Sequence, residues 1–523
     1  MAWNSAQRLR GLLSIGLILA LFAGCDSSPD SSADLSPVGS LSESDIRFFL
    51  QRTQFAATDA DVAAVQSQGL GAFVDSMLTY QDISALENQA LSQIIPDPNF
   101  PGSTQIADYW YAIMQDTPQP FQEVMALFWH DHFGVAQDVL GASQRHYMLR
   151  HIASLRQNGT GNLREFLYEM STDWAMMVFL DGRVSIKGNP NENFAREFFE
   201  LFTLGVNNGY EEYDVQEASR AFTGYRERFN DPVNPTAGAP VAPGMNWIEF
   251  QESRQDQLIK NILGVQLPGR SGPDAFLHYR DVVEHTLRYG KVAEFVARKL
   301  FSYFCYPNPP QSVVNDLAAV LRANDWELKP MLKRMLTSKA FFSSKARMGI
   351  IKSPVEHTVG LIRSTGLVLP PANIRVITSN AGQYLTYPPS VAGWPKPENG
   401  QLWLATINHV ERANAVRTMH STRTLQNSRS FNIHDLFPTD PTKEQIVDEL
   451  IRRMQVKLSP AERELILTYM DRDRVSAAGP LQGKHIIDPF AEAIAFDSTT
   501  NVIDIRARGA VYLLAQHPSF QIR

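Results

Sequence analysis

The chain has 523 residues, of which 48 are Lys or Arg and 55 are Asp or Glu, so the formal net charge is −7. Hydrophobic residues make up 44% and charged residues 20%, an ordinary globular composition that excludes collagen-like, disordered and polytopic membrane proteins. The acidic balance argues against a basic nucleic-acid-binding protein, so no nucleic acid is expected as a partner. Two cysteines are too few for a disulfide-rich scaffold.

Residues 1–24 are predicted to be a signal peptide. Arg8 and Arg10 precede an uncharged apolar run at 11–22, which is too short to span a membrane because a spanning helix takes about 20 residues. Small residues then lead to Cys25 in a pattern that resembles a bacterial lipobox. This resemblance implies cleavage before Cys25 and a diacylglyceryl group on its thiol. A plain secretory peptide followed by a chance cysteine is the alternative.

The lipobox resemblance also predicts where the protein resides. We expect an exported protein, anchored to membrane lipid through Cys25 at the cell envelope and facing the periplasm or the outside. Residues 25–42 are rich in Ser, Asp and Pro and are predicted to be a flexible tether, and residues 43–523 are predicted to form one helical domain. With Cys25 lipidated, Cys305 has no disulfide partner, and its apolar neighbours favour a buried free thiol.

Helical periodicity dominates the domain, and strand signals are few and short. The expected fold class is all-α, a large multi-helix bundle-like domain with two long irregular loops and little β structure. The loops are residues 227–275, with a small β-hairpin expected around 246–264, and residues 383–403. In chain order the predicted helices are 43–52, 59–68, 70–80, 104–116, 120–133, 139–157, 161–178, 191–205, 214–226, 278–289, 291–304, 326–337, 353–365, 406–419, 442–456, 459–472 and 505–516.

Six ordered segments carry a family resemblance. The longest is NENFAREFFELFTLGVNNGYEEYDVQEASRAFTGY at 191–225, which resembles the core signature of the bacterial domain of unknown function family 1800. The other segments that resemble blocks of this family are FWHDHFGV at 128–135, VARKLFSYF at 296–304, IKSPVEHTVG at 351–360, GQYLTYPPSVAGWP at 382–395 and LLAQHPSFQIR at 513–523. The resemblance implies an exported helical protein of unknown activity, with an exported sulfatase-related protein encoded nearby as a partner.

His130 and His132 are the first candidates for chemistry, because a His-x-His pair is a familiar metal-ligand spacing. Residues two apart lie about 200° apart around an α-helix, so both rings reach one ion only if the helix ends between them. Gly134 is compatible with such an end. The alternative is one ring buried in the core and the other at the surface.

Glu197 and Glu200 stand three residues apart on the predicted helix 191–205. Together with His130 and His132 they would form a carboxylate–imidazole site for a divalent metal in a helical bundle. Such a metal polarises an ester or lowers the pKa of water, and Arg196 would act as an electrophilic catalytic helper. The alternative is an ion-pair network around Arg196, whose neighbours at i−4 and i+4 are both Glu.

Tyr387, Trp394 and Trp403 are candidate ligand-binding residues on the stiff loop 383–403, because exposed aromatic rings stack on sugars or hold a partner. The alternative is a loop folded over the core by its own rings.

Three functions follow from these patterns. The first is an accessory or scaffold for a secreted partner, the second is a metal-assisted periplasmic hydrolase, and the third is a glycan-binding lipoprotein. The sequence leaves open whether the chain is an enzyme.

Overall fold

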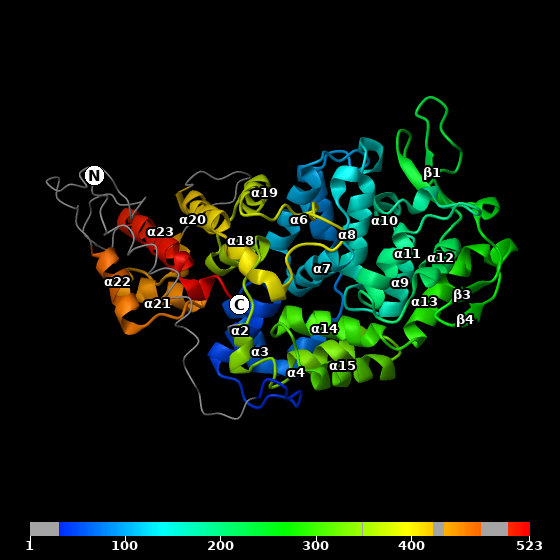
Figure 1. Ribbon diagram of the computed structural model, residues 1–523. Helices are drawn as coiled ribbons and strands as arrows, with labels where there is room; N and C mark the ends of the chain where they lie inside the picture. Colours follow the sequence, from blue (N-terminus) through cyan, green and yellow to red (C-terminus); the bar gives the residue numbers. More distant parts are fainter. Residues whose placement is uncertain (1–30, 348, 422–432, 472–499) are drawn as a thin grey trace, which may run out of the picture.

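The computed structural model describes residues 31–347, 349–421, 433–471 and 500–523. Within these ranges the chain is mostly helical, with two small antiparallel two-stranded sheets, which confirms the expected all-α class. Figure 1 shows an elongated body with α21 to α23 at one end and the strands at the other. The predicted signal peptide and Cys25 lie outside the described residues. Among the helices that the structure describes, none combines the length and apolar character that crossing a membrane requires.

The N-terminal half of the body is helical. A single predicted helix over 161–178 is replaced by two, because the Asp173 side chain accepts a hydrogen bond from the Met176 N–H and so begins a new helix. The elements are α2 Glu43–Thr53, α3 Asp59–Gln68, α4 Leu70–Leu78, α5 Ser84–Ile94, α6 Gln105–Asp116, α7 Pro120–His132, η1 Gln137–Val139, η2 Ala142–Gln144, α8 His146–Asn158, α9 Leu163–Ser171, α10 Trp174–Phe179, η3 Gly182–Val184, α11 Asn193–Glu197, the π-helix η4 Phe198–Thr203 and α12 Glu212–Ala221.

The strands differ from the single hairpin expected around 246–264. Strand β2 (Asn246–Phe250) pairs with β1 (Tyr225–Phe229), which overlaps the start of the expected loop 227–275, and β3 (Lys260–Ile262) pairs with β4 (Val265–Leu267). Leu263 and Gly264 both have positive φ, the geometry of a two-residue hairpin turn.

The rest of the chain returns to helices. They are η5 Glu252–Arg254, η6 Gly272–Leu277, α13 His278–Arg288, α14 Val292–Phe304, α15 Gln311–Ala323, α16 Leu328–Leu336, α17 Ser344–Arg347, α18 Pro354–Thr365, α19 Pro371–Asn380, η7 Pro397–Leu404, α20 Thr406–Ser421, η8 Ile433–Leu436, α21 Lys443–Met454, α22 Pro460–Met470, α23 Thr500–Gln516 and η9 Pro518–Phe520.

The described part of the predicted tether packs on the body. The Val38 N–H donates to the Thr337 carbonyl across 2.8 Å, and the Ala340 N–H donates to the Asp34 carbonyl across 2.8 Å. Leu35 is buried. One apolar side chain and a short backbone ladder thus hold residues 34–38 of the predicted flexible tether against the end of α16.

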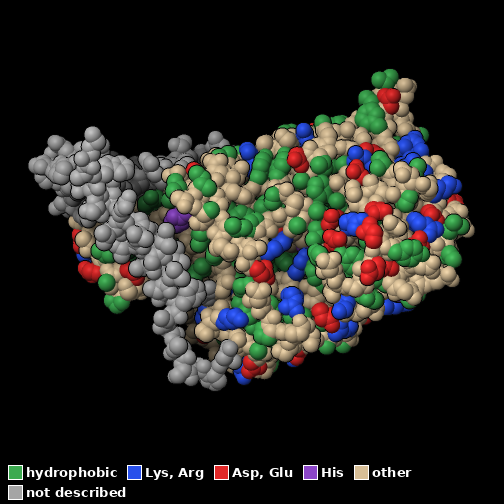
Figure 2. All heavy atoms as spheres, viewed as in Figure 1, with side chains coloured by type: hydrophobic (Ala, Val, Ile, Leu, Met, Phe, Trp, Pro, Cys, Tyr) green, Lys and Arg blue, Asp and Glu red, His purple; other side chains and the backbone are tan. Residues whose placement is uncertain are grey.

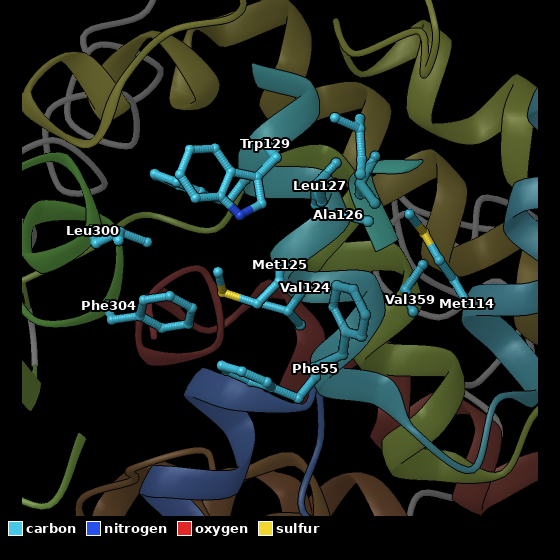
Figure 3. Packing of buried hydrophobic residues seen from close by; sticks show 14 of the residues in the cluster. Phe55, Met114, Val124, Met125, Ala126, Leu127, Trp129, Leu300, Phe304 and Val359 are labelled. Atoms are coloured by element: carbon cyan, nitrogen blue, oxygen red, sulfur yellow. The ribbon is translucent and has the colours of Figure 1, made fainter. Parts of the chain in front are cut away.

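Helix α7 is at the centre of the core. Figure 3 shows Val124, Met125 and Trp129 of α7 among side chains from other elements, including Phe55 and Phe304. A helix that is apolar on nearly every side belongs in an interior. The polar Glu123 is tolerated there because it accepts hydrogen bonds from Arg156 Nε across 2.5 Å and from Trp110 Nε1 across 2.8 Å. Cys305 is buried with a free thiol, as expected.

Candidate functional site

His130 faces away from the other predicted metal ligands. Its side chain is fully buried, with its ring 5.3 Å from that of Trp110 and 5.4 Å from that of Trp394. Neither ring nitrogen has a hydrogen-bond partner among the described residues. Burial holds the pKa of His130 well below its usual range, so the ring is neutral.

His132 uses both ring nitrogens for contacts between helices. The Lys299 ammonium donates to Nδ1 across 2.9 Å, and Nε2 lies 3.1 Å from the Phe202 carbonyl oxygen. Because a carbonyl only accepts, Nε2 carries the proton and Nδ1 is the acceptor. Burial, followed by the charge of Lys299, holds the pKa of His132 well below its usual range. The ring is therefore neutral and its lone pair is occupied.

Glu197, Glu200 and Arg196 lie at the end of α11 and in η4. Arg196 pairs with Glu192 across 3.1 Å and with Glu212 across 2.6 Å, the ion-pair network that was the alternative. Glu197 is half-buried, and desolvation followed by the charge of Glu200 raises its pKa.

The four predicted metal ligands therefore do not converge, which corrects the expected site at His130, His132, Glu197 and Glu200. Across the described ranges, no three His, Cys, Asp or Glu side chains are grouped so that they could hold a metal ion. The physical reason is the continuous α7, which ends only at His132 and so turns the two imidazoles to different sides.

The aromatic loop is folded inward. Trp394 and Trp403 are 6% and 5% exposed, and Tyr387 stacks on Tyr384 with ring centroids 4.2 Å apart. The expected ring surface for sugars is therefore not displayed by Trp394 and Trp403. These two rings instead line a pocket that is partly open to the surface.

This central pocket has a volume of about 50 Å³ and lies between the end of α7, the start of α18 and the loop before η7. Its apolar wall is made by the two tryptophans with leucine, isoleucine and proline side chains. Its polar lining residues are Asp131, Tyr303, Ser353, Glu356, Gln383 and Arg523.

The resembling segments meet at the central pocket. Five of the six supply a lining residue: 128–135, 296–304, 351–360, 382–395 and 513–523. The sixth, 191–225, contacts two of these segments, because the carbonyls of Leu201 and Phe202 accept hydrogen bonds from Lys299 and His132. These carbonyls are at the end of the π-helix, where backbone acceptors lack partners within the helix.

Asp131 binds the loop that carries Trp394 and Lys396 and so holds it beside the pocket. Its Oδ1 accepts the Trp394 N–H across 2.7 Å, and its Oδ2 lies 2.5 Å from the Lys396 ammonium. Gly393 has φ +81°, and a Cβ there would lie 2.2 Å from Asp131 Oδ1. Only glycine allows this approach.

On the opposite side of the central pocket, Glu356 links several of the polar lining residues. Its Oε1 accepts from the Tyr303 hydroxyl across 3.1 Å and pairs with Arg523 across 2.7 Å, while its Oε2 caps α18 at the Ser353 N–H. Burial and the Glu356 charge raise the pKa of Tyr303 well above its usual range. The phenol is therefore a fixed hydrogen-bond donor.

Lys299 lies beside the pocket, in contact with His132. Burial lowers its pKa to about 7, helped by the charge of Lys396 and opposed by that of Asp131. Figure 2 shows basic and acidic side chains meeting in a hollow near the middle of one face. Side chains whose pKa is shifted toward neutral pH cluster at functional sites.

Asp131, Lys299, Tyr303, Glu356 and Arg523 are the residues that the sequence reasoning missed. All five lie inside the resembling segments, which is the sequence signal that they share, and Asp131 stands between the two candidate ligands His130 and His132. These side chains lie near one another only because elements up to 392 residues apart in the sequence, from 131 to 523, pack together.

Comparison with the curated proteins and with the solved structures found no match. A family model described as a protein of unknown function, DUF1800, matches residues 48–522. That range covers nearly the whole chain and includes every pocket-lining residue except Arg523. The chain therefore belongs to the DUF1800 family.

Proposed function

We propose that this protein is an exported, lipid-anchored accessory protein that docks a secreted partner by taking one end group of that partner into the central pocket. The observation that supports this proposal is the meeting of five resembling segments at one small cavity. An exported sulfatase-related protein encoded nearby is the partner that we propose to test first. Cys25 would hold the complex at the membrane.

The size of the pocket favours docking of a single group. About 10–15 Å³ holds one water, so about 50 Å³ takes a group of three or four heavy atoms. A complete drug-sized ligand takes roughly 300 Å³ or more. The tryptophan wall suits an apolar part of the docked group, and Arg523 and Ser353 suit a polar end.

The polar groups of the pocket are already fixed. Asp131 and Glu356 each accept at least two hydrogen bonds from the protein. Fixed side chains lose little conformational freedom when a partner binds, which favours recognition. The metal-hydrolase alternative loses its four proposed ligands, because they lie apart.

Filling the pocket tests the docking proposal. In Gly400→Leu the added side chain enters the pocket without removing a hydrogen bond, since a Cβ at 400 makes ordinary contacts with Ile351. The full chain, expressed in its own envelope, should recover the partner at less than a tenth of the wild-type yield. Gly71→Leu is the control, because nothing lies within 4 Å of a Cβ at 71. Equal recovery by both variants would refute docking through this pocket.

A separate experiment tests the anchor. Cys25→Ser should release the protein from washed membranes and abolish its labelling by radioactive palmitate. If the wild-type protein takes up no palmitate label, or Cys25→Ser takes up as much label as the wild type, the lipid anchor is refuted while the pocket proposal stands.

A further inference from the structure

A second, smaller cavity lies behind the central pocket, on the other side of Glu356 and Arg523. Its volume is about 10 Å³, and its lining residues are Gln51, Arg52, Phe55, Val124, Lys352, Glu356 and Arg523. Figure 3 shows Phe55 near Val124 of α7, deep in the apolar core. The cavity is therefore lined mostly by polar side chains, although the region around it is hydrophobic.

The side chains that line this cavity are not balanced in charge. Three cations, Arg52, Lys352 and Arg523, face one carboxylate, Glu356, and all four side chains are buried. Arg412 adds a fourth buried cation behind Lys352, whose carbonyl it binds across 2.7 Å. Buried charge is costly unless it is paired, so this excess requires compensation.

The protein supplies part of that compensation. Arg52 donates to the carbonyls of Phe304 and Cys305, at the negative end of α14, and to the carbonyl of Ala346. Arg523 pairs with Glu356, and the Lys352 ammonium lies 4.0 Å from the Phe520 ring. These contacts satisfy individual donors, and Glu356 is the one acidic side chain among the lining residues.

Two buried donors around the cavity remain unused. The Nε atoms of Arg52 and Arg523 have no hydrogen-bond partner among the described residues. Desolvation lowers the pKa of Lys352 to about 7 and that of Arg52 well below its usual range. When the cavity contains no anion, the Lys352 ammonium therefore loses its proton more readily than an ordinary lysine does.

We propose that this cavity binds one monatomic anion, with chloride as the natural occupant, between Arg52, Lys352 and Arg523. The size of the cavity sets the class of ligand, because about 10 Å³ takes one water-sized particle and excludes phosphate or sulfate. Because chloride is larger than a water, the proposal includes a small outward shift of the Lys352 side chain when the ion binds. The two cavities share Glu356 and Arg523, but the inference does not depend on the proposed function, since a response to chloride needs neither Cys25 nor a docked partner.

Thermal unfolding of the full chain tests the site. Sodium chloride is compared with sodium gluconate at equal ionic strength, because gluconate is too large to enter. At a tenfold excess over Kd, chloride should raise the Tm by about 1–2 °C. Lys352→Met should lose most of this rise. Lys299→Met is the matched control, since it removes another largely buried amine whose pKa is lowered to about 7 but which does not line the cavity.

A crystal of the wild-type protein soaked in bromide gives a readout that does not depend on a variant folding. An anomalous peak between Arg52, Lys352 and Arg523 is expected. A bromide map without a peak there, equal Tm values in chloride and gluconate, or a full chloride response in Lys352→Met would each overturn the proposal. A water in the cavity with Lys352 deprotonated would then be the explanation.

Discussion

Lys299 donates a hydrogen bond to Nδ1 of His132 across 2.9 Å, and this contact joins α14 to the last residue of α7. The other ring nitrogen of His132 reaches the Phe202 carbonyl in η4. One neutral imidazole thus links three helices beside the central pocket. This explains why the His-x-His pattern does not produce a metal site here.

Replacing Lys299 should flatten the dependence of stability on pH. Its pKa in the folded chain is about 7, against 10.5 for an ordinary lysine. Between these values the unfolded chain carries a proton that the folded chain has lost, so the free energy of unfolding rises with pH over this window. Urea denaturation of Lys299→Met should show a shallower rise from pH 7 to 9. The exposed Lys187→Met should keep the wild-type slope, and an unchanged slope in Lys299→Met would contradict the assignment.

Gly393→Ala should destabilise the protein. A left-handed backbone costs about 1–2 kcal/mol in a residue with a Cβ, and the close approach to Asp131 adds to this. Chemical denaturation should show a loss of at least about 2 kcal/mol. Gly39→Ala should be nearly neutral, because its Cβ would meet nothing within 4 Å. Equal stabilities of the two variants would show that the loop does not approach Asp131 as described.

Glu123→Gln should be strongly destabilising. Glu123 is fully buried and pairs with the buried Arg156, so the substitution leaves a cation inside the core with reduced compensation. Breaking a buried pair in this way costs about 3–5 kcal/mol. Asp75→Asn breaks the exposed pair with Lys333 and should cost less than about 1 kcal/mol. Urea midpoints measure both, and a small effect at Glu123 would argue against the pairing.

Cys305 should be unreactive in the native protein. Burial raises the pKa of its thiol, and the side chain is inaccessible to solvent. A thiol reagent should leave Cys305 unmodified in buffer and label it fully in concentrated urea. Labelling of Cys305 in buffer, located by peptide mass spectrometry, would contradict the packing around the end of α14.

Helical hydrophobic periodicity, together with the proline and glycine residues between the periodic segments, was enough to predict many of the helices. For α7 the sequence predicts 120–133 and the structure has Pro120–His132, since proline favours a helix start and the apolar run extends from it. Helices α5, α15, α17 and α19 fall between the predicted elements, and α15 does so although it buries Val313, Val314, Leu317, Ala318 and Leu321. Ala90 is the only buried residue of α5, and α19 buries only Ile374, Ile377 and Thr378, so their periodic signal is weak.

The sequence by itself determined the helical class, the buried Cys305 and the segments that carry the family resemblance, because these depend on local pattern and composition. Only the tertiary structure decided that His130 and His132 point apart, that Trp394 and Trp403 turn inward, and that Asp131 and Arg523 line one pocket. The reason is that such neighbours come from elements far apart in the chain. Their directions depend on where each helix ends and on which side chains pack between them.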